Sequence, residues 1–454
     1  MGARLANRAT CSLQAVVLLG MAINVAAEPQ ERLPPERPLP NRTAIQAELS
    51  QLRERIEALE RLLSASAPDA ASSAAEPVLP AAGGRDSPAR QTPAVVEGDA
   101  GEARPVESVP EPWLDLGGAL RISYSWLDYD RGSKERRGDF DVELFRLDLT
   151  GGSGPFDFSV QYRWYNDFDT VHHAWLGYQL SDATRVRLGV VKVPFGLLPV
   201  ASHSFWFGAT YYLGFEDDYD SGLELHHAAD PWSVHLAFFK NAEYGSGRSE
   251  RYSFDVVTGG DQQNEELNQF NGRLAYRWQH ADTRNSEFGL SLMWGELHNK
   301  ATRDHGERHA IAVHWDGNLD PWHLQLQWLD YQFRPANPVG VSDRQIQLGA
   351  FGAPFLIAAA GEVVTFNLAR SFSTVPAPLD KITCYNDYSH VMPRGERARD
   401  SIQNVTGCLL IAGKIYTYLD WITGKNMWFI GGPGVGLNDD RWRSRFNVNI
   451  GYYF

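Results

Sequence analysis

The sequence predicts an all-β protein: a transmembrane antiparallel β-barrel of about 16 strands, preceded by an N-terminal α-helical coiled-coil segment. Two observations predict the barrel. The chain of 454 residues is polar on average, with a mean hydropathy of −0.35, yet it is 12% aromatic and contains 41 glycines. From about residue 113, apolar and polar residues alternate singly in segments of roughly 9–14 residues, as they do when one strand face meets lipid and the other a wet lumen.

Composition excludes two classes of protein. Each span of a helical membrane protein needs about 20 mostly apolar residues, and the only such stretch lies at the extreme N-terminus. The chain has 42 Lys and Arg against 56 Asp and Glu, a net charge of −14. Because a surface that follows nucleic-acid phosphates needs a basic excess, we expect no nucleic-acid partner.

Residues 1–27 have the pattern of a signal peptide. Arg4 and Arg8 precede an apolar stretch over 12–25, and small residues at 25–27 provide a cleavage site. The alternative is an N-terminal membrane anchor, for which the apolar stretch is too short. We therefore predict that the chain is exported.

The following segments predict a stalk. A Pro-rich lead over 28–40 precedes 41–64, where apolar residues recur at alternating spacings of four and three and form the seam of a coiled coil. Residues 65–112 are rich in Ala, Pro, Ser and Gly and are expected to be a disordered linker. Because this linker isolates the helix, we favour a self-associating periplasmic coiled coil over a helix that lies on its own domain. The seam consists of Ile45, Leu49, Leu52, Ile56, Leu59 and Leu63.

Residues 113–454 form the predicted barrel. In the last segment Phe446, Val448 and Ile450 alternate with charged and amide residues. Aromatic residues fall at segment ends, and short connections alternate with long ones, as in outer-membrane barrels. A soluble sandwich or propeller, the alternative, would not need so many outward Trp and Tyr residues. The predicted strands lie near 116–127, 141–151, 156–165, 171–180, 184–193, 220–228, 231–240, 268–280, 286–297, 308–317, 321–332, 361–371, 380–389, 405–412, 414–423 and 441–454.

One stretch resembles a known family. Residues 189–196, GVVKVPFG, resemble the G-x-x-K-x-P-F-G signature of the phosphate-selective porin O and P superfamily, and the aromatic strand that ends in Phe454 and the heptad segment are also similar. The resemblance covers about residues 113–454. It implies a trimeric passive channel, usually for anions, in the outer membrane of a Gram-negative bacterium. We accordingly expect outer-membrane lipid and lipopolysaccharide as partners, and a homotrimer formed through the barrel and the coiled coil.

The polar strand faces carry the candidate anion-lining residues. Arg441, Arg443 and Arg445 share one face of a strand, about 7 Å apart, and would form a luminal ladder. The alternative is that luminal arginines only pair with acidic residues and fill the barrel wall. The family signature places Lys192 near the start of the third long loop. The predicted anion-lining residues are Arg121, Arg163, Arg185, Arg187, Lys192, Arg273, Arg277, Arg441, Arg443 and Arg445.

The third long loop, 194–219, is the candidate constriction, because this loop commonly folds inward in sixteen-stranded porins. Its aromatic residues would form an apolar wall, and its acidic residues would face the arginines. The alternative is an outer loop whose acidic residues are solvated or bind divalent cations. We predict no cofactor and no metal site, and a structural Ca²⁺ site on Asp217, Asp218 and Asp220 is the alternative. The predicted constriction residues are Phe205, Trp206, Glu216, Asp217, Asp218 and Asp220.

Two cysteines, Cys384 and Cys408, follow the signal peptide. If 390–404 is the loop of a hairpin, its midpoint nearly coincides with the midpoint between the two cysteines. They would then face each other across adjacent strands, and we predict a disulfide.

These features predict an outer-membrane porin through which small hydrophilic solutes diffuse passively, with a preference for anions such as phosphate or organic anions. The second hypothesis is a barrel with a closed pore that acts in adhesion, assembly or partner binding. No G-x-S-x-G, H-E-x-x-H or P-loop motif occurs in a fitting context, so we predict that the protein is not an enzyme. The third hypothesis is a hydrolase at the barrel rim built from His203, Ser204 and Asp217.

Overall fold

The computed structural model describes residues 111–244 and 248–454. The predicted signal peptide, the Pro-rich lead, the coiled coil and nearly all of the linker lie outside the described residues. Within the described part, no helix combines the length and the apolar character that a membrane crossing requires.

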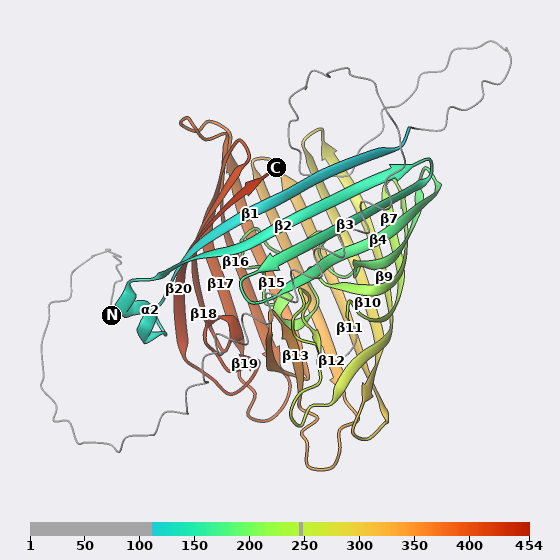
Figure 1. Ribbon diagram of the computed structural model, residues 1–454, viewed down its shortest axis with the longest axis vertical. Helices are drawn as coiled ribbons and strands as arrows, with labels where there is room; N and C mark the ends of the chain where they lie inside the picture. Colours follow the sequence, from blue (N-terminus) through green and yellow to red (C-terminus); the bar gives the residue numbers. More distant parts are fainter. Residues whose placement is uncertain (1–110, 245–247) are drawn as a thin grey trace, which may run out of the picture. The chain divides into compact units, whose positions relative to one another are not determined.

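Sixteen antiparallel strands of the described chain form a closed barrel (Figure 1), which confirms the predicted fold class. Every predicted segment coincides with one of these strands. Their bounds are β1 Trp113–Leu127, β2 Asp139–Ser153, β3 Phe156–Tyr165, β4 Asp169–Ser181, β5 Thr184–Lys192, β6 Tyr219–Ala229, β7 Trp232–Ala242, β9 Asn264–Ala281, β10 Arg284–Asn299, β11 His305–Leu319, β12 Trp322–Arg334, β15 Ala360–Phe372, β16 Lys381–Pro393, β17 Ser401–Ala412, β18 Ile415–Lys425 and β20 Trp442–Tyr453.

The first and last strands close the ring. β1 pairs with β20 in a register that places Ala119 opposite Tyr453, and Gly118 exchanges two backbone hydrogen bonds with Phe454, each 3.1 Å long. The C-terminus therefore lies at the rim where β2 turns into β3 and β4 turns into β5, here named the short-turn rim (Figure 1). The opposite end, where β5 leads to β6 and β12 leads to β15, is named the long-loop rim.

The strand faces are reversed relative to a soluble protein. On β12, Gln325 and Gln327 point inward and are 3% and 4% exposed, whereas Leu326 and Trp328 point outward and are 38% and 37% exposed. Folding in water would place the large apolar side chains inside. An apolar outer wall around a polar lumen is the arrangement that a bilayer favours. The alternation seen in the sequence is therefore the alternation between lipid and lumen.

Four further short strands in the described chain form a second sheet, in the order β19-β14-β13-β8. They are β8 Asp255–Val256, β13 Gln345–Ala350, β14 Ala353–Ala358 and β19 Gly434–Val435. These segments lie in long connections between the predicted strands, where the sequence predicted no strand. Ile346 and Ile357 of this sheet are fully buried and belong to one apolar core with Tyr331 and Phe333 on the inner face of β12. The interior thus becomes apolar toward the long-loop rim. The short helices are α2 Arg131–Arg136, η1 Tyr211–Leu213 and η2 Trp428–Ile430.

Candidate functional site

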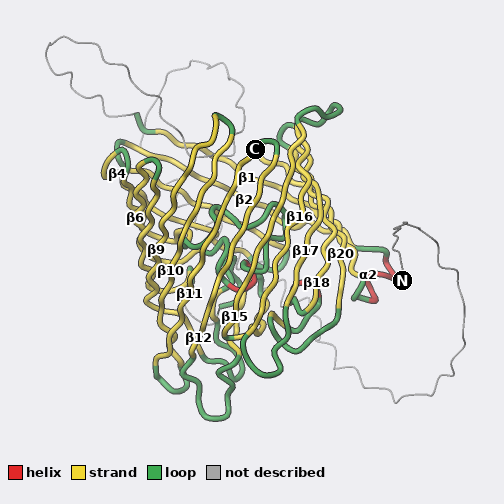
Figure 2. Tube along the Cα trace, turned by 180° about the vertical axis from the view of Figure 1, so that it is seen from behind, coloured by secondary structure: helices red, strands yellow, loops and turns green. Residues whose placement is uncertain are grey.

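The segment between β5 and β6, residues 193–218, folds into the barrel, where loops are visible inside the ring of strands in Figure 2. It follows the inner wall from β10 to β17 and bonds to inward polar side chains along the way. The bonds are Gly196 N to Ser291 Oγ at 3.0 Å, Leu197 N to Gln327 Oε1 at 2.8 Å, Asn367 Nδ2 to Ala201 O at 2.6 Å, Ala209 N to Ser389 Oγ at 3.1 Å and Gln403 Nε2 to Phe207 O at 2.8 Å.

Asp387 on β16 is the strongest single anchor of this inward loop. Its Oδ2 accepts hydrogen bonds from the backbone N–H groups of His203 and Ser204, both at 2.7 Å, and its Oδ1 lies 2.7 Å from His203 Nδ1. This contact also bears on the hydrolase hypothesis. The carboxylate that contacts His203 is Asp387 and not Asp217, and the hydroxyl of Ser204 has no hydrogen-bond partner among the described residues. The structure therefore does not bring His203, Ser204 and Asp217 together as a triad.

Lys192, from the resemblance motif, joins the two ends of the inward loop. Its Nζ lies 2.5 Å from Asp217 Oδ1 and donates to the carbonyl of Pro199 at 2.9 Å. Asp217 also accepts from the hydroxyl of Tyr252. Burial alone would raise the pKa of Asp217, but the Lys192 ammonium, the hydrogen bond from Tyr252 and the Arg163 guanidinium together hold the pKa below its ordinary value. Lys192 and Asp217 thus act as a clamp on the loop.

Glu216 stabilises the loop from within. Its carboxylate accepts from Thr210 Oγ1 at 2.6 Å, Ala201 N at 2.9 Å and Ser202 Oγ at 3.2 Å, and it has no ion-pair partner among the described residues. Burial raises the pKa of Glu216 to about 7. Glu216 was expected to face the arginines. Instead, its carboxylate accepts hydrogen bonds from residues of its own loop and stabilises the fold of that loop.

A cavity of about 770 Å³ separates the inward loop from β1, β3 and β20. Three arginines lie on its wall: Arg121 from β1, Arg163 from β3 and Arg445 from β20. Each guanidinium stacks on an aromatic ring from a loop inside the barrel. The Cζ-to-centroid distances are 4.9 Å from Arg121 to Phe205, 4.4 Å from Arg163 to Tyr252 and 3.9 Å from Arg445 to Trp206. The stacking fixes flexible side chains and leaves N–H groups at the ring edges.

The three cavity arginines differ in their pairing. Arg121 Nη2 lies 3.1 Å from Glu143 Oε1. Arg163 donates to the neutral Gln161 Oε1 at 2.6 Å, and Arg445 donates to the carbonyl of Phe429 at 3.3 Å. Within residues 111–244 and 248–454, neither Arg163 nor Arg445 forms an ion pair with a carboxylate. A buried positive charge at Arg163 and a half-buried one at Arg445 therefore face the cavity without an ion-pair partner.

The three arginines of the expected ladder on the last strand differ in exposure and in their partners. Arg443 is buried against Asp439, with Nη1 2.6 Å from Oδ2, and the side chain of Arg441 is 80% exposed and lies 3.3 Å from the same carboxylate. Asp439 precedes β20 and folds back onto the strand, where its carboxylate pairs with both Arg441 and Arg443. Only Arg445 reaches the cavity.

The remaining predicted arginines pair with acidic residues, which is the alternative to an anion-lining role. Arg273 also donates to the carbonyl of Gly196 at 2.9 Å and so helps to hold the inward loop. The pairs are Arg185 with Asp157, Arg187 with Glu224 at 3.1 Å, Arg273 with Glu287 at 2.5 Å and Arg277 with Glu287 at 3.9 Å.

Two predicted constriction residues, Asp218 and Asp220, lie away from the cavity in a buried group of carboxylates with Asp255.

Cys384 and Cys408 lie directly opposite each other in the register of β16 and β17, and their sulfur atoms are bonded at 2.08 Å.

Sequence reasoning missed Glu143, Tyr252 and Asp387. Tyr252 comes from the long connection between β7 and β9, whose path cannot be read from a local pattern. Glu143 and Asp387 both lie on strands, and the alternation shows only that their faces are polar. No local signal marks Asp387 as the anchor of a loop that lies 184 residues earlier in the chain.

Comparisons with known proteins rest on structure alone. No protein-family model matches the chain, and no curated protein sequence does. The solved structures that are similar include the outer-membrane channel DcaP of Acinetobacter baumannii, at 12% identity and a TM-score of 0.50, with 76% of this chain and 97% of that chain covered. An anion-selective porin from Comamonas acidovorans has 12% identity, a TM-score of 0.49 and coverages of 76% and 100%. OmpT of Vibrio cholerae has 13% identity, a TM-score of 0.47 and coverages of 76% and 98%. At 12% identity and a TM-score of 0.50, the likeness to the DcaP channel concerns the fold alone.

Proposed function

We propose that the protein is an outer-membrane porin through which small hydrophilic solutes diffuse passively, with a preference for anions. The observation that carries this proposal is the pair of arginines, Arg163 and Arg445, which face the cavity with no carboxylate partner among the described residues. An anion that enters the cavity can accept hydrogen bonds from both guanidinium groups. A cation meets the same two charges as a barrier.

The local balance of charge favours anions although the whole chain is acidic. The cavity lining contains three arginines, Arg121, Arg163 and Arg445, and two carboxylates, Glu143 and Asp217. Both carboxylates are already paired, Glu143 with Arg121 and Asp217 with Lys192. Charges in a low-dielectric wall act strongly over a few ångströms, whereas distant surface charges are screened by salt. The net charge of −14 therefore does not set the selectivity of the cavity.

The aromatic lining narrows the class of solute. Phe205, Trp206 and Tyr252 present apolar ring surface beside the arginines. Inorganic phosphate gains nothing from such surface, whereas an organic anion can place its carboxylate on the arginines and its apolar part on the rings. We therefore favour small organic anions over phosphate. Similarity to the phosphate-selective porin O and P superfamily is part of this proposal, and in this chain the Lys192 of that motif contacts Asp217.

The location and the assembly state belong to the same proposal. An apolar outer wall and the fold of outer-membrane porins support insertion in the outer membrane of a Gram-negative bacterium, among lipid and lipopolysaccharide. We further propose a homotrimer held by the barrels and by the predicted stalk over 41–64.

One observation favours the second hypothesis, a barrel with a closed pore that binds partners. The sheet β19-β14-β13-β8 packs inside the barrel in an apolar core that includes Ile346, Leu348 and Phe254. Such a core reduces the open cross-section near the long-loop rim. If it seals the lumen, the long loops would serve as a binding surface instead of a channel mouth.

The deciding experiment is the conductance of the purified protein in a planar bilayer under a KCl gradient. Three-step closure with a reversal potential that leans toward chloride would support a trimeric anion channel. A reversal potential that leans toward potassium would retain the porin but remove the anion preference. Complete absence of conductance, with the protein shown to be inserted, would favour the closed barrel.

A further inference from the structure

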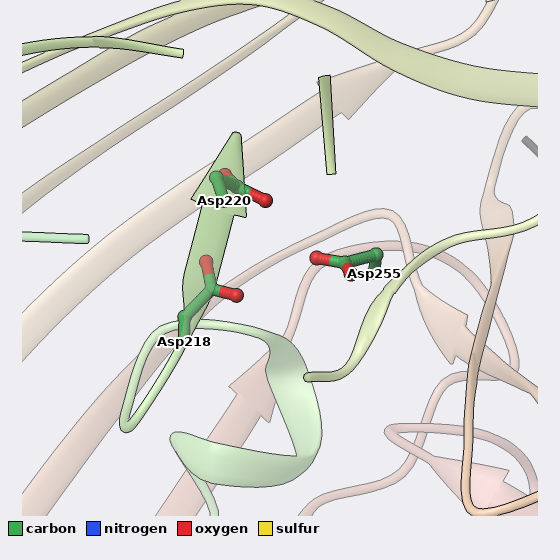
Figure 3. A group of neighbouring side chains, drawn as sticks. All are labelled: Asp218, Asp220 and Asp255. Carbon is green, nitrogen blue, oxygen red and sulfur yellow. The ribbon is translucent and has the colours of Figure 1, made fainter. Parts of the chain in front are cut away.

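Three carboxylates from different segments converge inside the barrel (Figure 3). Asp218 ends the inward loop, Asp220 lies near the start of β6 and Asp255 opens β8. One oxygen from each lies within 4.8 Å of the others, and the residues are 4%, 1% and 1% exposed. Asp218 and Asp220 flank Tyr219 and converge on Asp255, whereas Asp217, the residue before Asp218, pairs with Lys192.

The charges around this cluster do not balance. Two more buried carboxylates, Glu243 and Glu266, adjoin it, and two guanidinium groups contact the group. Arg251 Nη1 lies 2.7 Å from Asp255 Oδ2 and 3.5 Å from Glu243 Oε2, and Arg308 pairs with Glu266. Five carboxylates against two arginines leave a surplus of three negative charges in a buried place. Such a surplus is costly unless a cation or bound protons neutralise it.

Unsatisfied oxygen atoms point to a missing ligand. Asp218 Oδ1 and Asp220 Oδ1 are buried and accept no hydrogen bond within the described part of the chain. Neither residue has an ion-pair partner there. Asp220 Oδ2 accepts from Gln269 Nε2 at 3.2 Å, and the Asp218 carboxylate also interacts with the backbone N–H of Tyr219 and the hydroxyl of Ser253. Buried polar atoms are nearly always satisfied in folded proteins. A carboxylate oxygen of each residue lies on the side toward Asp255 (Figure 3).

We propose that Asp218, Asp220 and Asp255 bind one divalent cation, and that the cation is Ca²⁺. The donor set is entirely oxygen, which suits hard cations and not the transition metals that prefer nitrogen or sulfur. Mg²⁺ keeps several waters in a strict octahedron, whereas Ca²⁺ accepts irregular sets of carboxylates. Glu266, whose carboxylate interacts with Asp255, is the candidate for a fourth ligand.

The cation would have a mechanical role. It would join the end of the inward loop and the wall strand β6 to β8, and β8 pairs with β13 of the inner sheet. The competing account is neutralisation by protons, since burial raises the pKa of the Asp218 carboxyl well above its ordinary value, with a further contribution from Asp255. The two accounts differ in one measurable respect, which is whether metal binds.

The test uses the full chain refolded without lipopolysaccharide, because lipopolysaccharide binds divalent cations itself. The protein is treated with EDTA, dialysed against Ca²⁺ and analysed for bound metal by atomic absorption. We expect about one Ca²⁺ per chain, and a rise of roughly 3 °C or more in the unfolding midpoint on adding saturating Ca²⁺. The same dialysis against Mg²⁺ should show much weaker binding.

Variants locate the site. Asp218→Asn and Asp255→Asn should each lose the bound Ca²⁺ and its effect on the midpoint. In EDTA, Asp218→Asn should be at least as stable as the wild type, because it removes one surplus negative charge. Asp420→Asn, which changes a buried carboxylate that accepts from Tyr385 at 2.6 Å on the far strands, is the matched control and should keep the metal. Wild-type protein that binds no Ca²⁺, or folded Asp218→Asn and Asp255→Asn variants that bind as much as the wild type, would overturn the proposal. If a variant does not fold, the wild-type titration still decides whether metal binds.

Discussion

The guanidinium of Arg445 lies over the indole ring of Trp206, with its Cζ 3.9 Å from the ring centroid. The two residues join the last strand of the barrel to the inward loop. The ring holds the arginine in place, and the guanidinium still lines the cavity, where its positive charge has no carboxylate partner among the described residues. Because this contact fixes a positive charge at the cavity wall, Arg445 is the first target for mutation.

Replacing both Arg163 and Arg445 by Gln should weaken anion selectivity. The substitutions remove the two positive charges that have no carboxylate partner and keep side chains that can donate hydrogen bonds. We expect the permeability ratio of chloride to potassium, measured by reversal potential, to fall by roughly threefold or more. Arg441→Gln is the control, since that side chain is exposed and lies beside Asp439. An unchanged ratio in the double variant, with the barrel intact, would show that these arginines do not set selectivity.

Removing the Asp387 carboxylate should release the inward loop. Asp387→Ala leaves the N–H groups of His203 and Ser204 without their acceptor, at a cost of roughly 3 kcal/mol. We expect a lower unfolding midpoint and a larger, noisier single-channel conductance in planar bilayers. Ser389→Ala removes one backbone contact, from Ala209, and should cost only about 1 kcal/mol. Equal behaviour of the two variants would contradict a special role for Asp387.

Loss of the disulfide should lower stability without opening the channel. Cys384 and Cys408 close a loop with a sequence separation of 24 residues, for which the chain-entropy account gives roughly 3 kcal/mol. The bond joins two strands that already pair, and it is not part of the cavity lining. The Cys384→Ser, Cys408→Ser double variant should therefore unfold at lower urea concentration and conduct as the wild type does. A changed selectivity would indicate that the bond acts on the lumen.

Arginine substitutions on the outer wall should report the position of the bilayer. Leu292 lies in the middle of β10 and faces outward, whereas Leu114 faces outward near the short-turn rim. Leu292→Arg should cost roughly 2–4 kcal/mol of stability in lipid vesicles, and Leu114→Arg roughly 0–1 kcal/mol. Urea titration in vesicles measures both. Equal costs at the two positions would contradict the placement of Leu292 in the middle of the hydrocarbon core and of Leu114 at its edge.

The sequence allowed the barrel to be predicted strand by strand. Successive residues of each strand face lipid and lumen in turn, and this alternation of apolar and polar residues can be recognised locally in the sequence. β12 is an example, since its alternating Leu, Gln and Trp residues already define both faces. The inner sheet gave no such signal. Strand β14 is apolar on both faces, and in β13 polar and apolar residues alternate only from Gln345 to Leu348. Each strand is only six residues long, and they become strands because they pair with each other and pack on distant loops.

The composition of the site was predictable only in part. Alternation places Arg121, Arg163 and Arg445 on polar faces, but only closure of the ring brings β1 beside β20. Which acidic residue pairs with which arginine could not be foreseen, because Asp439, for example, reaches Arg443 through a turn in a long connection. The acidic end of the inward loop was similarly divided: Asp217, whose backbone φ is 50°, pairs with Lys192, whereas Asp218 joins the buried carboxylates.

Closure of the ring by β1 and β20 also limits which partial barrels are stable. Among the described strands β20 comes last along the chain, and its pairing with β1 seals the barrel. Before it is added, two strand edges carry unpaired N–H and C=O groups, each of which costs several kcal/mol in hydrocarbon. An incomplete chain therefore has no stable membrane-inserted form. A failure of translation yields a polypeptide that proteases can remove, and the permeability barrier of the cell is not breached by a half-built pore.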